Sequence, residues 1–337
     1  MSVTGPRSRG AVLERIWFGS RLAAVPLLPL AAVFWLVSTL RRLAYRCGIL
    51  RSARLPVPVV VVGNLTVGGA GKTPLVIWLA RHLRDRGLRV GVLSRGYRGR
   101  GGTFPATVTP TTDPAVVGDE PVLIAQRTGC PVVVDPDRVR GGRWLLGQMH
   151  CDLLVADDGL QHYRLDRDLE VAVVDGERRF GNGLLLPAGP LREGTGRLRT
   201  VDLVVTNGGV PHADEHRMVL RAHAIRPLAR PDAEQPIDTW RGRRVHAVAG
   251  IGNPERFFRM LRELGLEVDP LPFPDHHAFT AADLDLPGDG PVLMTEKDAV
   301  KCRAFAGPRH WVVPVDAELD AAFVSRLDTR LLELLDG

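Results

Sequence analysis

Short apolar runs alternate with amphipathic stretches along most of the chain, which is the pattern of strands and helices in an α/β fold. The runs are continuous and rich in β-branched residues, as is typical of parallel strands buried on both faces. We predict strands at 57–62, 90–94, 131–134, 153–156, 171–174 and 203–206. A helix after the first strand carries Leu75, Val76, Leu79 and Leu83 on one face. Six strands with intervening helices predict a doubly wound, mostly parallel sheet.

A stretch rich in proline and charge separates this sheet from a second, smaller α/β region. Beyond it we predict strands at 246–249, 291–294 and 311–315 and a helix at 255–264. The chain therefore divides into an N-terminal arm (1–54), a core domain (55–225), a linker (226–240) and a smaller α/β domain (241–337).

The N-terminal arm contains nineteen uncharged, mostly apolar residues, Leu22 to Leu40. As a straight helix this segment would be about 28 Å long, close to the thickness of a bilayer core. Pro26 and Pro29 lie in its first half and predict a kink or break there. Arginines flank both ends, so the positive-inside rule gives no orientation. We predict a helix that lies on or dips into an anionic membrane surface, and a true span stays open.

The charge distribution sets the arm apart from the body of the chain. The formal net charge is +6, but residues 1–54 hold nine arginines and one acidic residue, so the remaining 283 residues sum to −2. Aromatic residues make up only 6% of the chain. A nucleic-acid-binding protein would have a basic body with interleaved aromatics, so we expect no nucleic-acid partner. The four cysteines are far apart without CxxC spacing, which excludes a zinc ribbon or disulfide framework.

The most specific local feature is a glycine-rich turn between the first strand and its helix. It resembles the phosphate loop pattern GxxxxGK[ST], with Thr66 in place of the first glycine. Loop amides and a helix N-terminus together bind phosphate oxygens. Lys72 would reach the β- and γ-phosphates, and the Thr73 hydroxyl would ligate Mg²⁺. The predicted ATP-binding residues are Thr66, Val67, Gly68, Gly69, Ala70, Gly71, Lys72 and Thr73.

An acidic pair follows a later apolar strand. Asp157 and Asp158 come directly after Leu153–Ala156. Carboxylates at a strand end beside a phosphate loop hold Mg²⁺ directly or through water. Either aspartate would serve, and the sequence leaves the choice open.

Residues after two other strands narrow the class of nucleotide protein. A GTPase would carry Asn-Lys-x-Asp after a late strand, whereas this chain has Asn207-Gly208-Gly209. An ATP-driven partitioning switch would have Lys before the paired glycines, where this chain has Val67. A kinase or another ATP-using enzyme remains. Arg95, Tyr97 and Arg98 follow the second strand, at the sheet edge where ligands bind in open α/β folds, and are candidates for substrate contact.

Eight stretches in order along the chain resemble the tetraacyldisaccharide 4′-kinase family of lipid A biosynthesis. They are Gly63–Pro74, Ser94–Gly99, Gly118–Pro121, Asp157–His162, Phe180–Gly183, Leu186–Glu193, Asp275–Phe279 and Thr295–Asp298. The resemblance covers nearly the whole chain, including the apolar arm. It implies a P-loop NTPase-like core and transfer of the ATP γ-phosphate to the 4′-hydroxyl of a tetraacylated glucosamine disaccharide 1-phosphate.

The resemblance also implies roles for individual residues. Asp119 would accept the proton of the attacking hydroxyl, and His276 would orient that carboxylate or tune its pKa, although 157 residues separate them and His277 competes for the role. Asp119 taken alone would be a helix N-cap before Pro121. Glu193 would join the metal ligands and Arg192 would neutralise the transferring charge. Asn64, Gln161 and His162 are further candidates near the phosphate loop and acceptor.

A second hypothesis is an ATP-binding switch protein that the arm recruits to membrane. It explains the loop and the acidic pair but not a second domain carrying Asp275, His276 and His277. The kinase hypothesis places the protein at the cytoplasmic face of the inner membrane, peripheral or single-span. Its partners would be the acylated disaccharide and an anionic membrane surface, with ATP and Mg²⁺ as substrate and cofactor and no protein partner inferred.

Overall fold

The computed structural model describes residues 9–19, 21–96, 99, 102–230 and 232–335. The chain divides into two compact units, each made of segments that are not contiguous in sequence. Unit 1 comprises Met1–Lys72, Asp158–Met218 and Leu319–Gly337, and unit 2 comprises Thr73–Asp157 and Val219–Glu318.

Unit 1 contains a parallel sheet in the order β8-β7-β6-β1. Its strands are β1 (Val59–Gly63), β6 (Leu169–Asp175), β7 (Leu203–Asn207) and the first three residues of β8 (His216–Arg221). Its helices are α1 (Arg9–Phe18), η1 (Arg21–Leu27), α2 (Leu28–Arg46), η2 (Thr195–Thr200) and α10 (Ala321–Leu335). Every residue of β1, β6 and β7 is buried, as expected for parallel strands covered on both faces.

Unit 2 contains a sheet in the order β5-β2-β4-β3, in which only β3 runs antiparallel. Its strands are β2 (Val90–Ser94), β3 (Ala106–Val108), β4 (Val132–Val134) and β5 (Leu153–Asp157), and its helices are α3 (Lys72–Asp85), α4 (Pro114–Val117), α5 (Asp119–Thr128) and α6 (Arg138–Gln148). Pro74 lies in the first turn of α3, where the missing N–H costs no hydrogen bond. Gly87 follows the helix with φ +86°.

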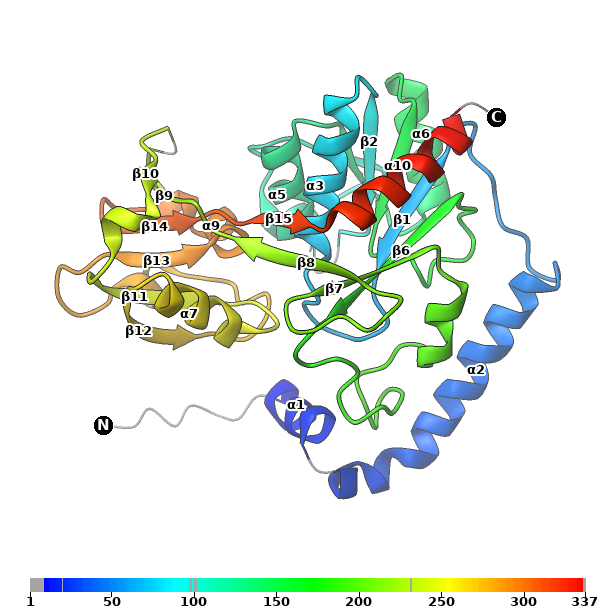
Figure 1. Ribbon diagram of the computed structural model, residues 1–337, viewed down its shortest axis with the longest axis horizontal. Helices are drawn as coiled ribbons and strands as arrows, with labels where there is room; N and C mark the ends of the chain where they lie inside the picture. The colour runs from blue at the N-terminus through cyan, green and yellow to red at the C-terminus, as the bar shows by residue number, and fades with distance from the viewer. Residues whose placement is uncertain (1–8, 20, 97–98, 100–101, 231, 336–337) are drawn as a thin grey trace. The chain divides into compact units, whose positions relative to one another are not determined.

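A second sheet of unit 2 has the order β10-β9-β14-β13-β11-β12 and is drawn in yellow-green to orange in Figure 1. Its strands are β9 (Ala224–Pro227), β10 (Gln235–Pro236), β11 (Arg244–Ala249), β12 (Glu267–Pro272), β13 (Val292–Thr295) and β14 (His310–Val313), and β15 (Asp316–Leu319) follows. Its helices are η3 (Ile237–Trp240), α7 (Pro254–Glu263), α8 (Ala281–Leu284), α9 (Glu296–Cys302) and η4 (Arg303–Phe305). Trp240, Phe257, Phe258 and Leu261 belong to one core cluster, and Phe279, Val292 and Met294 to another.

These elements confirm the predicted α/β class with a mostly parallel main sheet, and the strands predicted from sequence match observed strands within about two residues at each end. The structure differs from the prediction at 226–240, which is not a bare linker. The end of β9, β10 and η3 all lie there, and Ile237 and Trp240 are buried in the core beside the second sheet. The prolines of this stretch predicted a loop, but Pro236 lies in β10, the edge strand of the sheet, where proline is tolerated.

The C-terminal segment also departs from the predicted domain boundary. Residues 319–337 belong to unit 1, although the sequence placed them in the smaller domain. Phe323, Leu327 and Leu331 form the buried face of α10, and Phe323 packs edge-on against His216 of β8. Asp320 accepts hydrogen bonds from the backbone N–H groups of Arg217 and Phe323.

The N-terminal arm forms η1 followed by α2, the long blue helix of Figure 1. Pro26 lies in the 3₁₀ segment and Pro29 in the first turn of α2, so both prolines occupy positions that need no α-helical N–H bond. Residues 21–46 are long and apolar enough to cross a membrane by length and composition, and 11% of their most apolar window is buried. Apolar contacts with Leu184 and Ala188 hold the start of the arm against the rest of unit 1.

Candidate active site

The phosphate loop runs from the end of β1 to the start of α3 at Lys72. Gly68 and Gly71 have φ values of +104° and +96°, which L-residues rarely adopt. A Cβ at Gly71 would also lie 2.2 Å from Asn207 Nδ2, and that side chain donates a 3.0 Å hydrogen bond to the carbonyl of Ala70. The last residue of β7 therefore braces the loop, and only glycine fits against it.

Two cations and one carboxylate meet beside this loop. Lys72 Nζ donates to Asn64 Oδ1 at 3.0 Å and lies 3.5 Å from Asp158 Oδ1. Arg192 donates to both oxygens of Asp158, at 2.8 Å and 3.1 Å, and to the Asn64 carbonyl at 3.0 Å. Asn64 is fully buried and links both cations. This Lys72 cluster carries more positive than negative charge, which suits the binding of an anionic phosphate.

Asp157 and Asp158 are neighbours in sequence with different surroundings. Asp157 ends β5, is 1% exposed and accepts a 3.3 Å hydrogen bond from Ser94 Oγ. Asp158 has φ +48° and pairs with Lys72 and Arg192.

Glu193 is a buried carboxylate of unit 1. Gln161 Nε2 donates to its Oε2 at 3.1 Å, the Tyr163 hydroxyl donates to its Oε1, and Arg197 Nε lies 4.0 Å from Oε2. Gln161 also donates to the Asn64 carbonyl at 3.1 Å. The Gln161 amide thus joins Glu193 to the residue at the centre of the Lys72 cluster, and His162 is half-buried in the same loop.

The carboxylates suit the kind of site that Mg²⁺ occupies in phosphoryl-transfer enzymes. Within the described part of the chain, no three His, Cys, Asp or Glu side chains form a ready-made metal cage. Mg²⁺ beside a nucleotide takes one or two carboxylates and completes its shell with phosphate oxygens and water. The hydroxyl of Thr73 and the carboxylates of Asp157, Asp158 and Glu193 are oxygen donors of the kind that this ion takes.

Asp119 and His276 are in contact within unit 2, although 157 residues separate them. His276 Nδ1 lies 3.2 Å and 3.1 Å from the two carboxylate oxygens of Asp119, and both side chains are largely buried. Burial raises the pKa of Asp119, but the hydrogen bond from His276 and the charges of Lys297 and Lys301 outweigh it and hold this pKa well below its usual range. The carboxylate is therefore ionised at neutral pH. Because an ionised carboxylate only accepts, Nδ1 of His276 carries the hydrogen.

Lys297, which the sequence did not single out as a site residue, lies at the centre of the surrounding charges. Its Nζ donates to Glu120 Oε1 at 3.0 Å and lies 3.5 Å from Asp275 Oδ1 and 3.4 Å from His276 Nε2. Burial lowers the pKa of Lys297, but the charges of Glu120, Asp119 and Asp275 raise it far above its ordinary value. We call Asp119, Glu120, Asp275, His276, Lys297 and Lys301 the Asp119 cluster.

The backbone beneath His276 is fixed by the first turn of α9. Asp298 is fully buried and accepts hydrogen bonds from Gly250 N at 2.9 Å and Thr295 Oγ1 at 2.6 Å. The carbonyl of Gly250 in turn accepts from His276 N at 3.1 Å. His276 has φ +60°, a conformation that such fixed neighbours stabilise.

His277 points to different partners. Its Nε2 lies 3.2 Å from Asp283 Oδ2, and its ring packs between Phe273 and Phe279. Of the two histidines that the sequence left open, His276 is the one beside Asp119.

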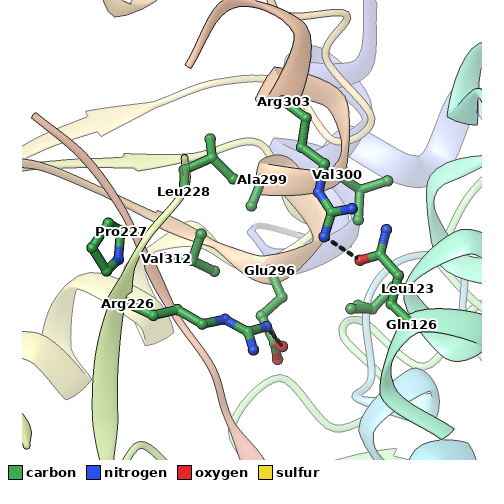
Figure 2. Close-up of a pocket in the computed structure, with 10 residues that line it drawn as sticks. All are labelled: Leu123, Gln126, Arg226, Pro227, Leu228, Glu296, Ala299, Val300, Arg303 and Val312. Carbon is green, nitrogen blue, oxygen red and sulfur yellow. Dashed lines mark hydrogen bonds and ion pairs between the residues drawn. The ribbon is translucent and has the colours of Figure 1, made fainter. Parts of the chain in front are cut away.

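The face between α5 and α9 is closely packed near this cluster. Figure 2 shows a small cavity there, with Arg226 paired to Glu296 and Arg303 donating to Gln126 across it. Its volume of about 20 Å³ is room for a single water molecule, so it is not a nucleotide or lipid pocket. Arg127 of α5 forms a buried ion pair with Glu296 of α9, which fixes the two helices that carry Asp119 and Lys297.

The predicted residues thus form two groups, each within one unit. The described residues of unit 1 include Asn64, Thr66–Lys72, Asp158, Gln161, His162, Arg192 and Glu193, and those of unit 2 include Thr73, Arg95, Asp119, Asp157 and His276.

Gly118 occupies the N-cap position of α5, so Asp119 is its first helical residue and not its cap. Arg95 is exposed just after β2, and Tyr97 and Arg98 lie outside the described residues. Sequence reasoning missed Tyr163 and Lys297, although both lie within or beside the stretches that carry the family resemblance.

Comparison with known proteins gives a consistent family match. The LpxK family model, described as tetraacyldisaccharide-1-P 4′-kinase, matches residues 23–332. Among similar proteins, the tetraacyldisaccharide 4′-kinase of Nitrosococcus oceani is 51% identical over 313 residues, covering 93% of this chain and 92% of that protein. The enzyme of the same name from Methylobacillus flagellatus is 50% identical over 325 residues, covering 96% and 97%.

The fold also matches a solved structure. A crystal structure of LpxK from Aquifex aeolicus in complex with ATP superimposes with a TM-score of 0.78 at 29% sequence identity. The match covers 93% of this chain and 99% of that chain. The P-loop-type core predicted from the sequence is therefore confirmed as the fold of this chain.

Proposed function

The chain belongs to the tetraacyldisaccharide-1-P 4′-kinase family, and from this premise we propose which residues carry out its reaction. The enzyme transfers the γ-phosphate of ATP to the 4′-hydroxyl of a tetraacylated glucosamine disaccharide 1-phosphate, a step of lipid A biosynthesis. The observation that supports our assignment best is the contact between Asp119 and His276, which places a carboxylate that stays ionised beside a histidine donor.

Phosphate binding is assigned to the loop and to the Lys72 cluster. The amides of residues 66–73 and the Lys72 ammonium would hold the β- and γ-phosphates of ATP. Arg192 would neutralise negative charge on the transferring group, because its guanidinium already makes a bidentate contact with a carboxylate at this loop. Asn64 orients both cations through its buried side chain and backbone.

Mg²⁺ binding is assigned to oxygen donors around the same loop. Thr73, one or both of Asp157 and Asp158, and Glu193 would hold the ion. When bound, it supplies positive charge that offsets the negative charge of the phosphate oxygens during transfer.

Asp119 is assigned as the group that receives the proton of the acceptor. As the 4′-oxygen forms its bond to the γ-phosphorus, the bond from that phosphorus to the β,γ-bridging oxygen breaks and ADP leaves. The hydroxyl proton passes to the Asp119 carboxylate, which is already ionised. His276 orients this carboxylate through Nδ1–H, and Lys297 faces the opposite ring nitrogen. The smaller domain thereby completes the active site by supplying His276 and Lys297.

Five residues are assigned to contact with the acceptor or the nucleotide. Arg95, Tyr97 and Arg98 would meet the 1-phosphate of the acceptor or the nucleotide, and Gln161 and His162 would line the acceptor side of the loop. We propose that α2 contacts an anionic membrane surface at the cytoplasmic face, where ATP is available, either peripherally or as a single span.

A switch protein recruited to membrane is not favoured. The family match covers residues 23–332, a span that includes the second sheet with His276, and the relatives carry the name of a kinase. Such a switch would have no use for an ionised carboxylate held by His276 and Lys297.

The activity is tested by incubating the full chain with γ-labelled ATP, Mg²⁺ and the tetraacyl disaccharide 1-phosphate in mixed micelles. We expect label in the lipid product, and we expect Lys72→Ala to abolish most of it. Binding of ATP without label in the lipid would overturn the kinase assignment and favour the switch.

A further inference from the structure

The loop that holds Glu193 also contacts the N-terminal arm. Gln161 and Tyr163 both donate to the Glu193 carboxylate. The phenol carries an O–H hydrogen, so it acts as a donor to Glu193.

Three side chains lie close to the Tyr163 ring, which is half-buried. The guanidinium carbons of Arg167 and Arg197 lie 5.4 Å and 6.0 Å from its centroid. The ring of Tyr45, in the last turns of α2, lies 5.9 Å away at an interplanar angle of 36°. This is within the range of favourable aromatic pairs.

Two polar contacts strengthen the link between the arm and this loop. Arg41 of α2 donates to the carbonyl of Gln161 at 3.4 Å, and its guanidinium lies 5.9 Å from the Tyr45 ring centroid. Ser52, just beyond α2, donates to the carbonyl of Tyr163 at 2.7 Å. The end of the arm therefore touches both residues whose side chains hold Glu193.

We propose that Tyr163 is a positioning residue of the kinase, whose hydroxyl fixes the Glu193 carboxylate and whose ring is supported by Tyr45 of α2. The inference rests on the proposed role of Glu193 in the active site. It gives the arm a second task besides membrane contact, because the last turns of α2 become part of the support of the phosphate-binding side.

A physical consequence follows for Glu193. Without the phenol donor, the carboxylate keeps Gln161 and has Arg197 4.0 Å away as a competing partner. It would turn toward that guanidinium and away from the position that it needs for an ion beside ATP. Such residues hold a metal ligand without touching the metal. Their substitution typically lowers metal affinity or activity by 10- to 100-fold.

The first test separates the hydroxyl from the ring. Tyr163→Phe keeps the ring between Tyr45 and the two arginines but removes the donor. We expect kcat to fall about tenfold and the Mg²⁺ concentration for half-maximal rate to rise by a similar factor, with KM for ATP within about twofold of wild type. An unchanged Mg²⁺ dependence and kcat would overturn the proposal, and thermal unfolding checks that the variant is folded.

The second test addresses the arm. Tyr45→Ala removes the supporting ring, Tyr45→Phe retains it, and Leu43→Ala removes another large side chain from the same helix at a position that is 51% exposed. We expect about a threefold fall in kcat for Tyr45→Ala, rescue in Tyr45→Phe, and a smaller change in Leu43→Ala. Flotation with anionic phospholipid vesicles should show Tyr45→Ala still bound. If kcat and vesicle binding instead fall in proportion in all three variants, Tyr45 is only a membrane contact. That result would overturn its role in supporting Tyr163.

A double variant and a variant of Glu193 distinguish the positioning role of Tyr163 from the proposed role of Glu193 itself. In the double variant Tyr45→Ala/Tyr163→Phe, we expect less than the product of the single effects, because both act through the same carboxylate. Glu193→Gln is measured alongside. If Glu193→Gln is inactive while Tyr163→Phe is normal, the positioning role fails and the proposed function stands. If Glu193→Gln itself turns over normally, the assignment of Glu193 in the proposed function fails.

Discussion

The Lys72 cluster and the Asp119 cluster are both built from charged side chains, but they balance those charges in opposite ways. In the first, Lys72 and Arg192 share the single carboxylate of Asp158, so positive charge is in excess. In the second, three carboxylates and two lysines surround His276, so that opposite charges are paired. The first arrangement suits an incoming anion, whereas the second keeps one carboxylate ionised in a buried place. Variants of each cluster should therefore fail in different ways.

The largest effect on kcat is expected from the Asp119 cluster. Asp119→Ala should lower kcat by about 10²–10⁴-fold because the acceptor proton loses its receiver, while ATP binding stays within about twofold of wild type. Label transfer measures the first quantity and calorimetric titration with ATP the second. Near-normal turnover in this variant would remove Asp119 from the reaction.

In the Lys72 cluster, by contrast, ATP binding and kcat should be lost together. Lys72→Ala should weaken ATP binding as well as lower kcat by about 10²–10³-fold, because its ammonium contacts phosphate in the ground state as well as during transfer. The same titration and transfer assays apply. Lys301→Ala, in the Asp119 cluster, is the matched lysine control for ATP binding. If Lys72→Ala bound ATP normally, the contrast between the two clusters would be lost.

Lys297→Met should lower kcat about tenfold at neutral pH and change its pH dependence. Removing the ammonium raises the pKa of Asp119, since the charge of Lys297 is among the causes that depress it. The acidic limb of the kcat profile should therefore move to higher pH in the variant. Lys297→Arg, which keeps the charge, should restore the wild-type limb.

Lys297→Met should also change how the free energy of unfolding depends on pH. The depressed pKa of Asp119 contributes stability that is fully present above the unfolded value of about 4 and is lost as pH falls through the folded value. The difference in free energy of unfolding between wild type and Lys297→Met should thus be larger at pH 7 than at pH 3. Urea denaturation at the two pH values measures it, and an equal difference at both would show that Asp119 is not the coupled group.

The smallest effect is expected from His277→Ala. Its ring contacts Asp283 and two phenylalanines and does not contact Asp119, so kcat should stay within about twofold while the melting temperature drops. His276→Ala should lower kcat at least tenfold in the same assay. Equal losses in the two variants would mean that the contact with Asp119 is not what matters.

The two clusters also differ in how much of them could be predicted from the sequence. Most of the Lys72 cluster comes from two stretches with recognisable local patterns, a strand–loop–helix turn and an acidic strand end. The carboxyl ends of parallel strands meet at one edge of a sheet, so their proximity follows from the fold class. The strand β1 and the apolar face of α3 were predicted for the same local reason, although β1 begins two residues later than predicted.

The Asp119 cluster depends on contacts that no local pattern encodes. Asp119 begins α5, His276 lies in a loop and Lys297 lies on α9, and these meet because α5 packs against α9. The family resemblance supplied the pairing of Asp119 with His276. Lys297 lies in Thr295–Asp298, one of the stretches that carry the resemblance, but its contact with Glu120, 177 positions away, could not be predicted from a local pattern. Tyr163 was missed because its role depends on Tyr45, a residue 118 positions away. The short strands β9 and β10 were missed because proline-rich stretches predict loops more often than edge strands.

The return of α10 to unit 1 bears on how the chain matures during synthesis. The apolar arm precedes both sheets in the chain, whereas Phe323, Leu327 and Leu331, which fill the core of the same unit, follow both sheets. Domains usually fold from the N-terminus as they emerge. Here the core of unit 1 needs a helix that is translated after both sheets, so a premature stop near residue 318 would leave a nascent product whose first unit has an open core.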